Sequence, residues 1–185
     1  MAASADLAEM GFRRLGSGVI IWDRAQILYP AEIYLGDHVM IDDFALLNGK
    51  GGLWIGSYVH VVSFASITGG GGCRLGAFTS LSAGARIFSG TENVEDSLFG
   101  PGVPPDFRNA IRRAVDIGNH VLIGANAVIL PGARIFDGVV IGAGSVVLQN
   151  QVCDAWCIYA GSPARKIRER DSREVTRKAT ELRSR

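Results

Sequence analysis

A large aliphatic residue stands at every sixth position of the stretch IGNHVLIGANAVIL, residues 117–130, and this spacing continues through Ile135, Ile141 and Val147. Neither an α-helix, with 3.6 residues per turn, nor a plain strand, with a side-chain period of two, produces a period of six. A solenoid of short parallel strands with three faces explains it, because each hexad supplies one strand and one corner. Three hexads then close one coil, and stacked coils bury a continuous core.

The first half of the chain carries the same pattern with a longer repeat. Its aliphatic residues recur in steps of six, six and eight, and a small residue recurs with them at Ala25, Ala45, Ala65 and Ala85. Each repeat opens on a Leu-Gly or Ile-Gly pair that begins at Leu15, Leu35, Ile55 or Leu75. The two extra residues per coil predict one bulged corner, over Asn48–Trp54 and Thr68–Arg74, where glycines give the backbone freedom to turn.

Two departures from the repeat define the remaining organisation. Residues 88–116 form an insertion whose prolines, Pro101, Pro104 and Pro105, exclude a long helix or a central strand. A loop of this length in a regular solenoid is usually functional. We therefore predict an N-terminal arm over residues 1–14, a β-helix over residues 15–161 that carries this loop, and a C-terminal helix over residues 162–185.

The sequence of the C-terminal segment favours a helix that folds back on the open end of the solenoid. Ser162 suits the N-cap and Pro163 the first turn. One face of this helix would be apolar, with Ile167, Val175, Ala179 and Leu182. The segment is also basic, since residues 165–185 carry nine Lys/Arg and four Asp/Glu.

Composition limits the class of protein. Hydrophobic residues make up 48% of the 185 residues and the formal net charge is +1, which excludes a disordered chain. No apolar run approaches the roughly 18 residues of a membrane helix, and the N-terminus lacks the apolar core of a signal peptide. Cys73, Cys153 and Cys157 form no CxxC pair and are expected to be reduced thiols. We expect a cytoplasmic protein that spans no membrane and binds no nucleic acid.

The segments 117–129 and 141–147 resemble the hexapeptide-repeat acyltransferases of the sugar O- and N-acetyltransferase type, and Tyr159–Arg165 is similar to that family's exit from the β-helix. The resemblance implies a left-handed parallel β-helix with an extruded loop and a C-terminal α-helix. It also implies a homotrimer, with active sites between subunits that the loop reaches. The implied reaction is acyl transfer from a CoA thioester, acetyl-CoA in the first instance, to a hydroxyl or amine of a sugar or nucleotide-linked sugar in surface-polysaccharide biosynthesis.

The resemblance also assigns the donor site. In this family the pantetheine arm of CoA lies in a groove between adjacent β-helices. Carried onto matching positions, the contacts are Ala125, Ala143, Leu148 and Arg165, and Lys166 would join Arg165 at the CoA phosphates. Many relatives have threonine at the position of Leu148, so a hydroxyl contact is absent there.

The catalytic position departs from the family pattern. Relatives that use acetyl-CoA place a histidine base near the start of the loop, where this chain has Glu92. Either this carboxylate takes over the role of base or the chemistry differs. A glutamate with an ordinary pKa is a weak base for a sugar hydroxyl, although burial can raise that pKa, whereas with an amine a carboxylate attracts the ammonium form and accepts its proton. The change therefore favours an amine acceptor. Glu95 and Asp96 are alternates for this role, and Ser82 is a candidate hydrogen-bond partner of the acceptor.

Other assignments remain open from the sequence. Arg108, Arg112 and Arg113 would either hold an acceptor phosphate or be exposed. Transfer to oxygen or to nitrogen, and an acetyl or a longer acyl group, all fit the pattern. Two rival functions are a non-catalytic β-helix scaffold and a metal-dependent, carbonic-anhydrase-like protein. The second is disfavoured, because the chain's histidines lie 22 and 60 residues apart and do not readily converge on one ion: His38, His60 and His120.

Overall fold

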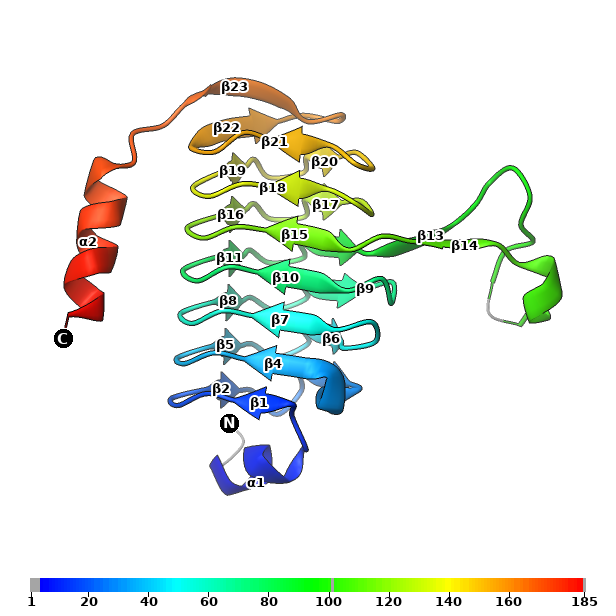
Figure 1. Cartoon of the computed structure of the whole chain (residues 1–185), viewed down its shortest axis with the longest axis horizontal. Helices are drawn as coiled ribbons and strands as arrows, with labels where there is room; N and C mark the ends of the chain where they lie inside the picture. Colours follow the sequence, from blue (N-terminus) through cyan, green and yellow to red (C-terminus); the bar gives the residue numbers. More distant parts are fainter. Residues whose placement is uncertain (1–3, 101, 185) are drawn as a thin grey trace.

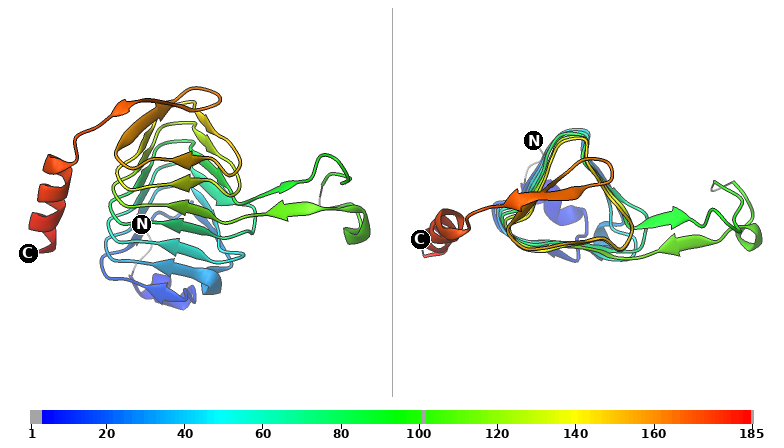
Figure 2. Two further views of the ribbon diagram at one scale, coloured as in Figure 1. Left: turned by 45° about the horizontal axis from the view of Figure 1, so that its top comes forward. Right: turned by 90° about the horizontal axis from the view of Figure 1, so that it is seen from above.

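The computed structural model describes residues 4–100 and 102–184, with side chains from Leu7 onward, as a three-sided parallel β-solenoid with a helix near each end and one long loop (Figure 1). Seen along its axis, the coils superpose as a triangle (Figure 2). This confirms the three-faced solenoid that the period of six predicts. Within the described ranges, no helix is long and apolar enough to cross a bilayer.

Successive coils contribute one strand to each of three sheets. The first sheet contains β1 (Arg14–Leu15), β4 (Ile33–Leu35), β7 (Leu53–Ile55), β10 (Cys73–Leu75), β15 (Val115–Ile117), β18 (Arg134–Ile135) and β21 (Val152–Cys153). The second contains β2 (Ile20–Ile21), β5 (Met40–Ile41), β8 (His60–Val61), β11 (Ser80–Leu81), β16 (Leu122–Ile123), β19 (Val140–Ile141), β22 (Cys157–Ala160) and β23 (Arg165–Glu169). The third contains β3 (Gln26–Leu28), β6 (Leu46–Asn48), β9 (Ser66–Thr68), β12 (Arg86–Phe88), β17 (Val128–Ile129) and β20 (Val146–Val147).

Strand register follows the aliphatic repeat through the whole solenoid. Leu35 pairs with Ile55, Ile55 with Leu75, and Leu75 with Ile117 on the far side of the insertion. All four of these side chains are fully buried. Burying one such side chain contributes about 1.5–3 kcal/mol, so the stacked aliphatic columns hold the coils together. The long loop therefore leaves the solenoid without interrupting its core.

The bulged corner lies between the third and the first sheet, as predicted for residues 48–54 and 68–74. Gly51 and Gly69 adopt φ values of 84° and 108°, which side chains with a Cβ rarely tolerate. A Cβ on Gly69 would also collide with the backbone nitrogen of Gly90. Glycine at this corner is thus required both for its backbone conformation and for close packing against the root of the loop.

Another corner, between the first and the second sheet, carries bulky residues in five coils and glycine in two, Gly18 and Gly138. The five bulky residues adopt left-handed φ values of 54–59° and stack ring on ring: His38, Tyr58, Phe78, His120 and Trp156. Neighbouring ring centroids are 4.9 to 6.1 Å apart. We call this stack the aromatic ladder. Each stacked pair contributes about 0.5–1.5 kcal/mol, which offsets the cost of the left-handed backbone.

The N-terminal arm contains the helix α1 (Ser4–Glu9). Residues 1–3, which the sequence also assigns to this arm, lie outside the described residues. Leu7 is 2% exposed and belongs to the buried core. Met10 and Phe12 also pack against that core. The N-terminal arm therefore covers the open end of the first coil.

The C-terminal segment differs from its prediction. No helix begins at Ser162; Ser162–Pro163 is a cis peptide, β23 runs antiparallel to β22, and α2 spans only Arg173–Arg183. The edge of the last coil explains the difference, since β22 would otherwise leave unpaired backbone groups. Ile167 consequently lies in the exposed strand β23. The helix runs beside the solenoid, not over its open end (Figure 2).

Candidate active site

The insertion is an arm with its own hydrogen bonds. The strands β13 (Gly90–Glu92) and β14 (Ala110–Arg112) pair antiparallel and project from the corner between the third and the first sheet (Figure 1). Beyond them, the Asn93 N–H donates to the Asn109 carbonyl at 2.8 Å and the Leu98 N–H to the Phe107 carbonyl at 2.9 Å. A short 3₁₀ helix, Pro105–Phe107, completes the arm. The arm thus holds its side chains in defined positions.

Glu92 lies at the end of β13 and is held by two donors. Arg108 donates from Nη2 to Oε1 at 2.5 Å, and the Ser97 hydroxyl donates to Oε2 at 3.0 Å. The hydrogen bond from Arg108 holds the pKa of this carboxyl below its usual value, against the opposing effect of burial. Glu92 is therefore a stable carboxylate and a poor proton acceptor, but a good partner for a cation.

A hollow of about 200 Å³ opens beside Glu92 at the root of the arm. Arg108 and Arg112 line it with Glu92, so that two guanidinium groups and one carboxylate share a small space. The Nε of Arg108 is buried and has no hydrogen-bond partner among the described residues. Arg113 does not line this hollow; it is exposed and its backbone N–H donates to the Ser89 carbonyl. The hollow can bind a ligand that carries both a positive and a negative group.

The alternates to Glu92 have other surroundings. Asp96 accepts hydrogen bonds from the Asn109 amide at 2.8 and 3.0 Å, which ties the two sides of the arm together. Glu95 is exposed, and neither acid lines the hollow beside Glu92. Among the three candidate acids, Glu92 is the one that the structure places with two arginines.

Ser82 lies at the corner between the second and the third sheet. Its backbone N–H donates to the Ile123 carbonyl at 2.9 Å, while its hydroxyl makes no hydrogen bond within the part of the chain that is described. Ser82 precedes β12 and Glu92 follows it, so the two candidates stand at opposite ends of this strand. One chain alone does not bring them together.

The predicted donor residues are also divided between corners. Ala125 and Ala143 lie at the corner of Ser82 on successive coils, linked by a 2.8 Å hydrogen bond from the Gly144 N–H to the Ala125 carbonyl. Leu148 follows β20 at the corner that carries the arm, and it is 42% exposed. Arg165 and Lys166 lie exposed on β23 at the end of the solenoid. A hydrogen bond with Cys157 and another with Glu169 raise the pKa of Lys166, so it remains charged.

The histidines do not form a metal centre. His60 contacts both carboxylate oxygens of Asp42 through Nε2 at 3.0 Å, while His38 and His120 belong to the aromatic ladder. Residues 4–100 and 102–184 contain no group of three or more potential metal ligands. The ladder was missed from the sequence, although an aromatic or histidine residue at the same hexad position in successive repeats is a signal that could have found it.

A three-sided parallel solenoid built on a six-residue period is the fold of hexapeptide-repeat proteins. The family model described as bacterial transferase hexapeptide (six repeats) matches residues 114–149. The dTDP-4-amino-4,6-dideoxy-D-glucose acyltransferase of Escherichia coli is 35% identical over 169 residues, which are 90% of this chain and 87% of that protein. The chain therefore belongs to the hexapeptide-repeat acyltransferase family.

Solved structures show the same similarity over the whole chain, with the arm and the C-terminal helix included. A serine-to-cysteine mutant of AntD, an N-acyltransferase from Bacillus cereus, in complex with dTDP-4-amino-4,6-dideoxyglucose and coenzyme A is 32% identical, with a TM-score of 0.91 over 100% of this chain and 97% of that one. AntD with dTDP and 3-hydroxybutyryl-CoA is also 32% identical, with a TM-score of 0.91 over 99% and 96%. These findings confirm the acyltransferase interpretation and favour it over a non-catalytic scaffold.

Proposed function

We propose that this protein transfers an acyl group from acyl-CoA to the amino group of a sugar carried on a nucleoside diphosphate. The observation that carries the proposal is the Glu92 carboxylate held beside Arg108 and Arg112 in one hollow. The relatives named for dTDP-linked amino sugars support a dTDP-4-amino-4,6-dideoxy sugar as acceptor. We place the reaction in the cytoplasm, in surface-polysaccharide biosynthesis.

The ionisation of Glu92 favours nitrogen over oxygen as the acceptor atom. A sugar hydroxyl needs a base that removes its proton as it attacks, and a carboxylate with a lowered pKa does this poorly. An amine is already a nucleophile, and its ammonium form is attracted to a carboxylate. In the overall transfer, nitrogen attacks the thioester carbonyl, the carbon–sulfur bond breaks, nitrogen loses one proton, and CoA leaves as the thiol.

The arginines suit the anionic part of the acceptor. Guanidinium groups bind phosphate oxygens through paired hydrogen bonds. Arg112 is exposed at the hollow, and the unpartnered Nε of Arg108 is a further donor. A diphosphate beside these groups would hold the sugar with its amine next to Glu92.

The division of the candidate residues between corners supports a site shared by subunits of a homotrimer. The arm of one subunit would bring Glu92 to the corner of the next, where the unbonded hydroxyl of Ser82 lies beside the small residues Ala125 and Ala143. Leu148, Arg165 and Lys166 would meet the donor from the other side. Structures of AntD have been solved with one serine replaced and, separately, with one aspartate replaced. Those two positions are ten residues apart in the AntD sequence, as are Ser82 and Glu92 in this one.

A thiol-release assay tests this function. With dTDP-4-amino-4,6-dideoxyglucose as acceptor and acetyl-CoA or 3-hydroxybutyryl-CoA as donor, Glu92→Gln should lower kcat/KM by about one to two orders of magnitude, because it removes the charged partner of the amine. Asp116→Asn is the matched control, because Asp116 lies half-exposed on the first sheet beside Arg74 and should leave the rate unchanged. A Glu92→Gln rate within threefold of the unmodified protein would contradict the assignment, and faster release with a neutral sugar would contradict an amine acceptor.

A further inference from the structure

A cleft of about 300 Å³ opens on the outer face of the first sheet, at the strands β4, β7 and β10 (Figure 1). It lies between this sheet, the 3₁₀ turn Pro30–Glu32 and the bulged corner. We call it the first-sheet cleft and define it by Arg13, Glu32, Tyr34, Leu53, Trp54 and Cys73. It shares no residue with the hollow beside Glu92. Its volume is at the lower end of the roughly 300–1,000 Å³ that is usual for small-molecule sites, so it suits a small ligand.

Two aromatic rings form one wall of the first-sheet cleft. Tyr34 and Trp54 pair in register on β4 and β7, and their rings stack with centroids 3.9 Å apart and an angle of 15° between the planes. Arg14, on the preceding coil, lies over the ring of Tyr34 at 4.8 Å from its centroid. On the following coil, Arg74 pairs with Asp116 at 3.6 Å, and Trp54 remains 49% exposed. The wall can therefore pack against an apolar group of a ligand.

The inner part of the first-sheet cleft is also apolar. Leu53 and Cys73 line it and are buried. Burial raises the pKa of the Cys73 thiol, so this group stays neutral at physiological pH. Gly52 lines the cleft as well, and a Cβ at this position would meet no atom within 4 Å. The cleft therefore combines an apolar interior with open space at the bulged corner.

Two side chains of opposite charge line the first-sheet cleft without pairing with each other. Arg13 is exposed, and its guanidinium has no hydrogen bond or ion pair with any described residue. The Gly51 N–H donates to Oε2 of Glu32 at 2.9 Å, which holds this carboxylate in place. Its second oxygen, Oε1, has no partner in the described part of the chain. The cleft thus offers a guanidinium for an anionic group and a carboxylate oxygen for a cationic one.

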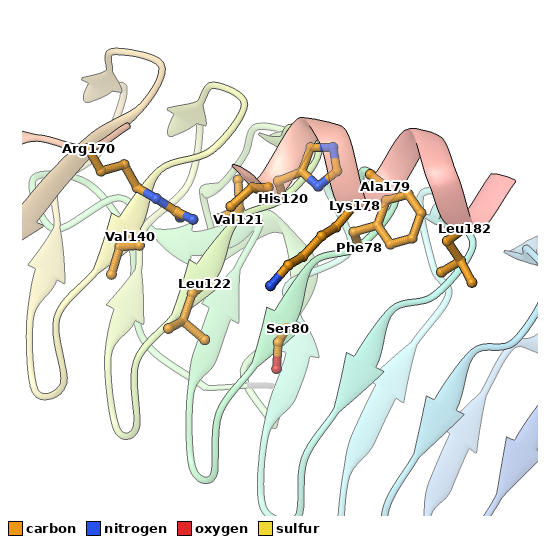
Figure 3. Close-up of a pocket in the computed structure, with 11 residues that line it drawn as sticks. Phe78, Ser80, His120, Val121, Leu122, Val140, Arg170, Lys178, Ala179 and Leu182 are labelled. Carbon is orange, nitrogen blue, oxygen red and sulfur yellow. The ribbon is translucent and has the colours of Figure 1, made fainter. Parts of the chain in front are cut away.

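The larger space between α2 and the solenoid differs from the first-sheet cleft in its charges. It measures about 490 Å³, and the described residues that line it include Arg170 and Lys178 but no carboxylate (Figure 3). Positive charge alone attracts anions of many kinds and selects no particular one. The first-sheet cleft places both signs of charge beside an aromatic wall, so its charge pattern specifies a narrower class of ligand.

We propose that the first-sheet cleft binds a free α-amino acid with an apolar side chain. The α-carboxylate pairs with Arg13, the ammonium group pairs with Oε1 of Glu32, and the side chain packs against the rings of Tyr34 and Trp54. Such a ligand balances both charges of the cleft, whereas a neutral sugar or a nucleobase leaves both without a counter-charge. The cleft is therefore a second ligand site, and its occupancy does not depend on the acyl transfer proposed above.

Calorimetric titration with L-leucine tests this site on the whole chain, with no acyl donor or acceptor present. We expect saturable binding. Two analogues each lack one charge: 4-methylpentanoate has no amino group, and 3-methylbutylamine has no carboxylate. Each should bind about tenfold more weakly, because it loses one charge-assisted interaction. No binding of L-leucine or L-phenylalanine, or an analogue that binds as tightly as L-leucine, would overturn the proposal.

Substitutions assign each charge to its partner. Arg13→Gln should weaken the binding of L-leucine by about tenfold and leave that of 3-methylbutylamine unchanged, because this probe has no carboxylate. Glu32→Gln, which keeps an oxygen for the Gly51 N–H, should weaken L-leucine and leave 4-methylpentanoate unchanged. Arg74→Gln is the matched control on the same sheet outside the cleft and should change neither. Equal losses for all probes would contradict these pairings, and displacement of L-leucine by dTDP would assign the cleft to the acceptor instead.

Discussion

The pairing of Glu92 with Arg108 changes what this carboxyl group can do. Because the folded pKa of Glu92 is lowered, the pair stabilises the fold at neutral pH, and this contribution is lost as the pH falls through the lowered value. Around pH 7 the group is a fixed negative charge. A histidine with an ordinary pKa would instead exchange protons near neutrality, so the two residues differ in what they can do at this position.

Gly71 provides a second test at the residue scale. A Cβ at this position would collide with the carbonyl oxygen of Ser89 and approach the backbone nitrogen of Arg113, which together form the root of the arm. Gly71→Ala should therefore lower the free energy of unfolding by about 1–3 kcal/mol and reduce turnover. Chemical denaturation and the thiol-release assay measure the two effects.

Gly102→Ala is the control for this substitution. A Cβ on Gly102 would meet no atom within 4 Å, and the residue is exposed in the part of the arm beyond β13 and β14. The two variants differ in steric crowding, not in chemistry. Equal stability of the Gly71 and Gly102 variants would show that the root of the arm yields to an added methyl group.

At the scale of elements, the aromatic ladder and α2 depend on each other. Arg170 lies over the ring of Trp156 and Arg183 over that of Phe78, with His120 between these rungs. Burial lowers the pKa of His120 and both arginines add to this effect, while Asp137 opposes it. The C-terminal segment thus contacts the ladder on both sides of His120, whose ring is neutral at pH 7.

A pH dependence follows for the folded state. Between the lowered pKa and the ordinary value of 6.5, the unfolded chain binds more protons at His120 than the folded chain does. Stability should therefore fall as the pH drops below 6.5. The His120→Phe variant keeps the stack without a titrating ring, and its Tm should fall less between pH 7.5 and 5.5.

His38→Phe is the control, because His38 stacks in the same ladder on Tyr58 but does not line the space between α2 and the solenoid. Thermal unfolding followed by circular dichroism at each pH measures the difference. If His120→Phe and His38→Phe flatten the pH dependence equally, the effect does not arise at the contact with α2.

The sequence predicts well those elements whose buried residues recur at a fixed, short spacing. Each coil needs one buried aliphatic residue per face, so the six-residue spacing could be read directly. Strand β23 could not be predicted in this way, because all five of its side chains are exposed and it is held by backbone pairing with β22. Arg, Lys and Glu favour helices in isolation, and pairing at the edge of the solenoid overrides that preference.

The candidate site was predictable only where it depends on local sequence. The position of Glu92 could be inferred from the start of the insertion. Its ion pair with Arg108 spans 16 residues and exists only because β13 pairs with β14. Ser82 could likewise be proposed from the sequence. Its distance in space from Glu92 depends on which corners of the three-sided solenoid the two residues occupy, and their spacing in the sequence does not give that distance.

At the scale of the whole molecule, a shared site predicts complementation between inactive subunits. Ser82→Ala and Glu92→Gln should each reduce activity in a pure oligomer. When the two variants are coexpressed, some interfaces should combine an intact arm from one chain with an intact Ser82 corner from another. We expect partial recovery of thiol release, measured on oligomers separated by affinity tags.

Oligomers that contain only one of the two variants are the control. Mixing either variant with itself should give no recovery, and the oligomers must have the same mass as the unmodified protein. If mixed oligomers are no more active than the better of the two variants, Ser82 and Glu92 do not serve the same site across a subunit boundary.

The direction of α2 beside the solenoid has a geometric consequence. Coils are spaced by about 4.8 Å, close to the 5.4 Å pitch of an α-helix. A helix that runs along the stack therefore advances nearly one turn per coil, and Val175, Ala179 and Leu182 are spaced by four and three residues, one turn each. The two periodicities are nearly commensurate. Inserting or deleting a whole coil between the arm and the last strand would shift the helix by almost one turn and present an equivalent apolar residue, so the molecule can change length while keeping these surfaces matched.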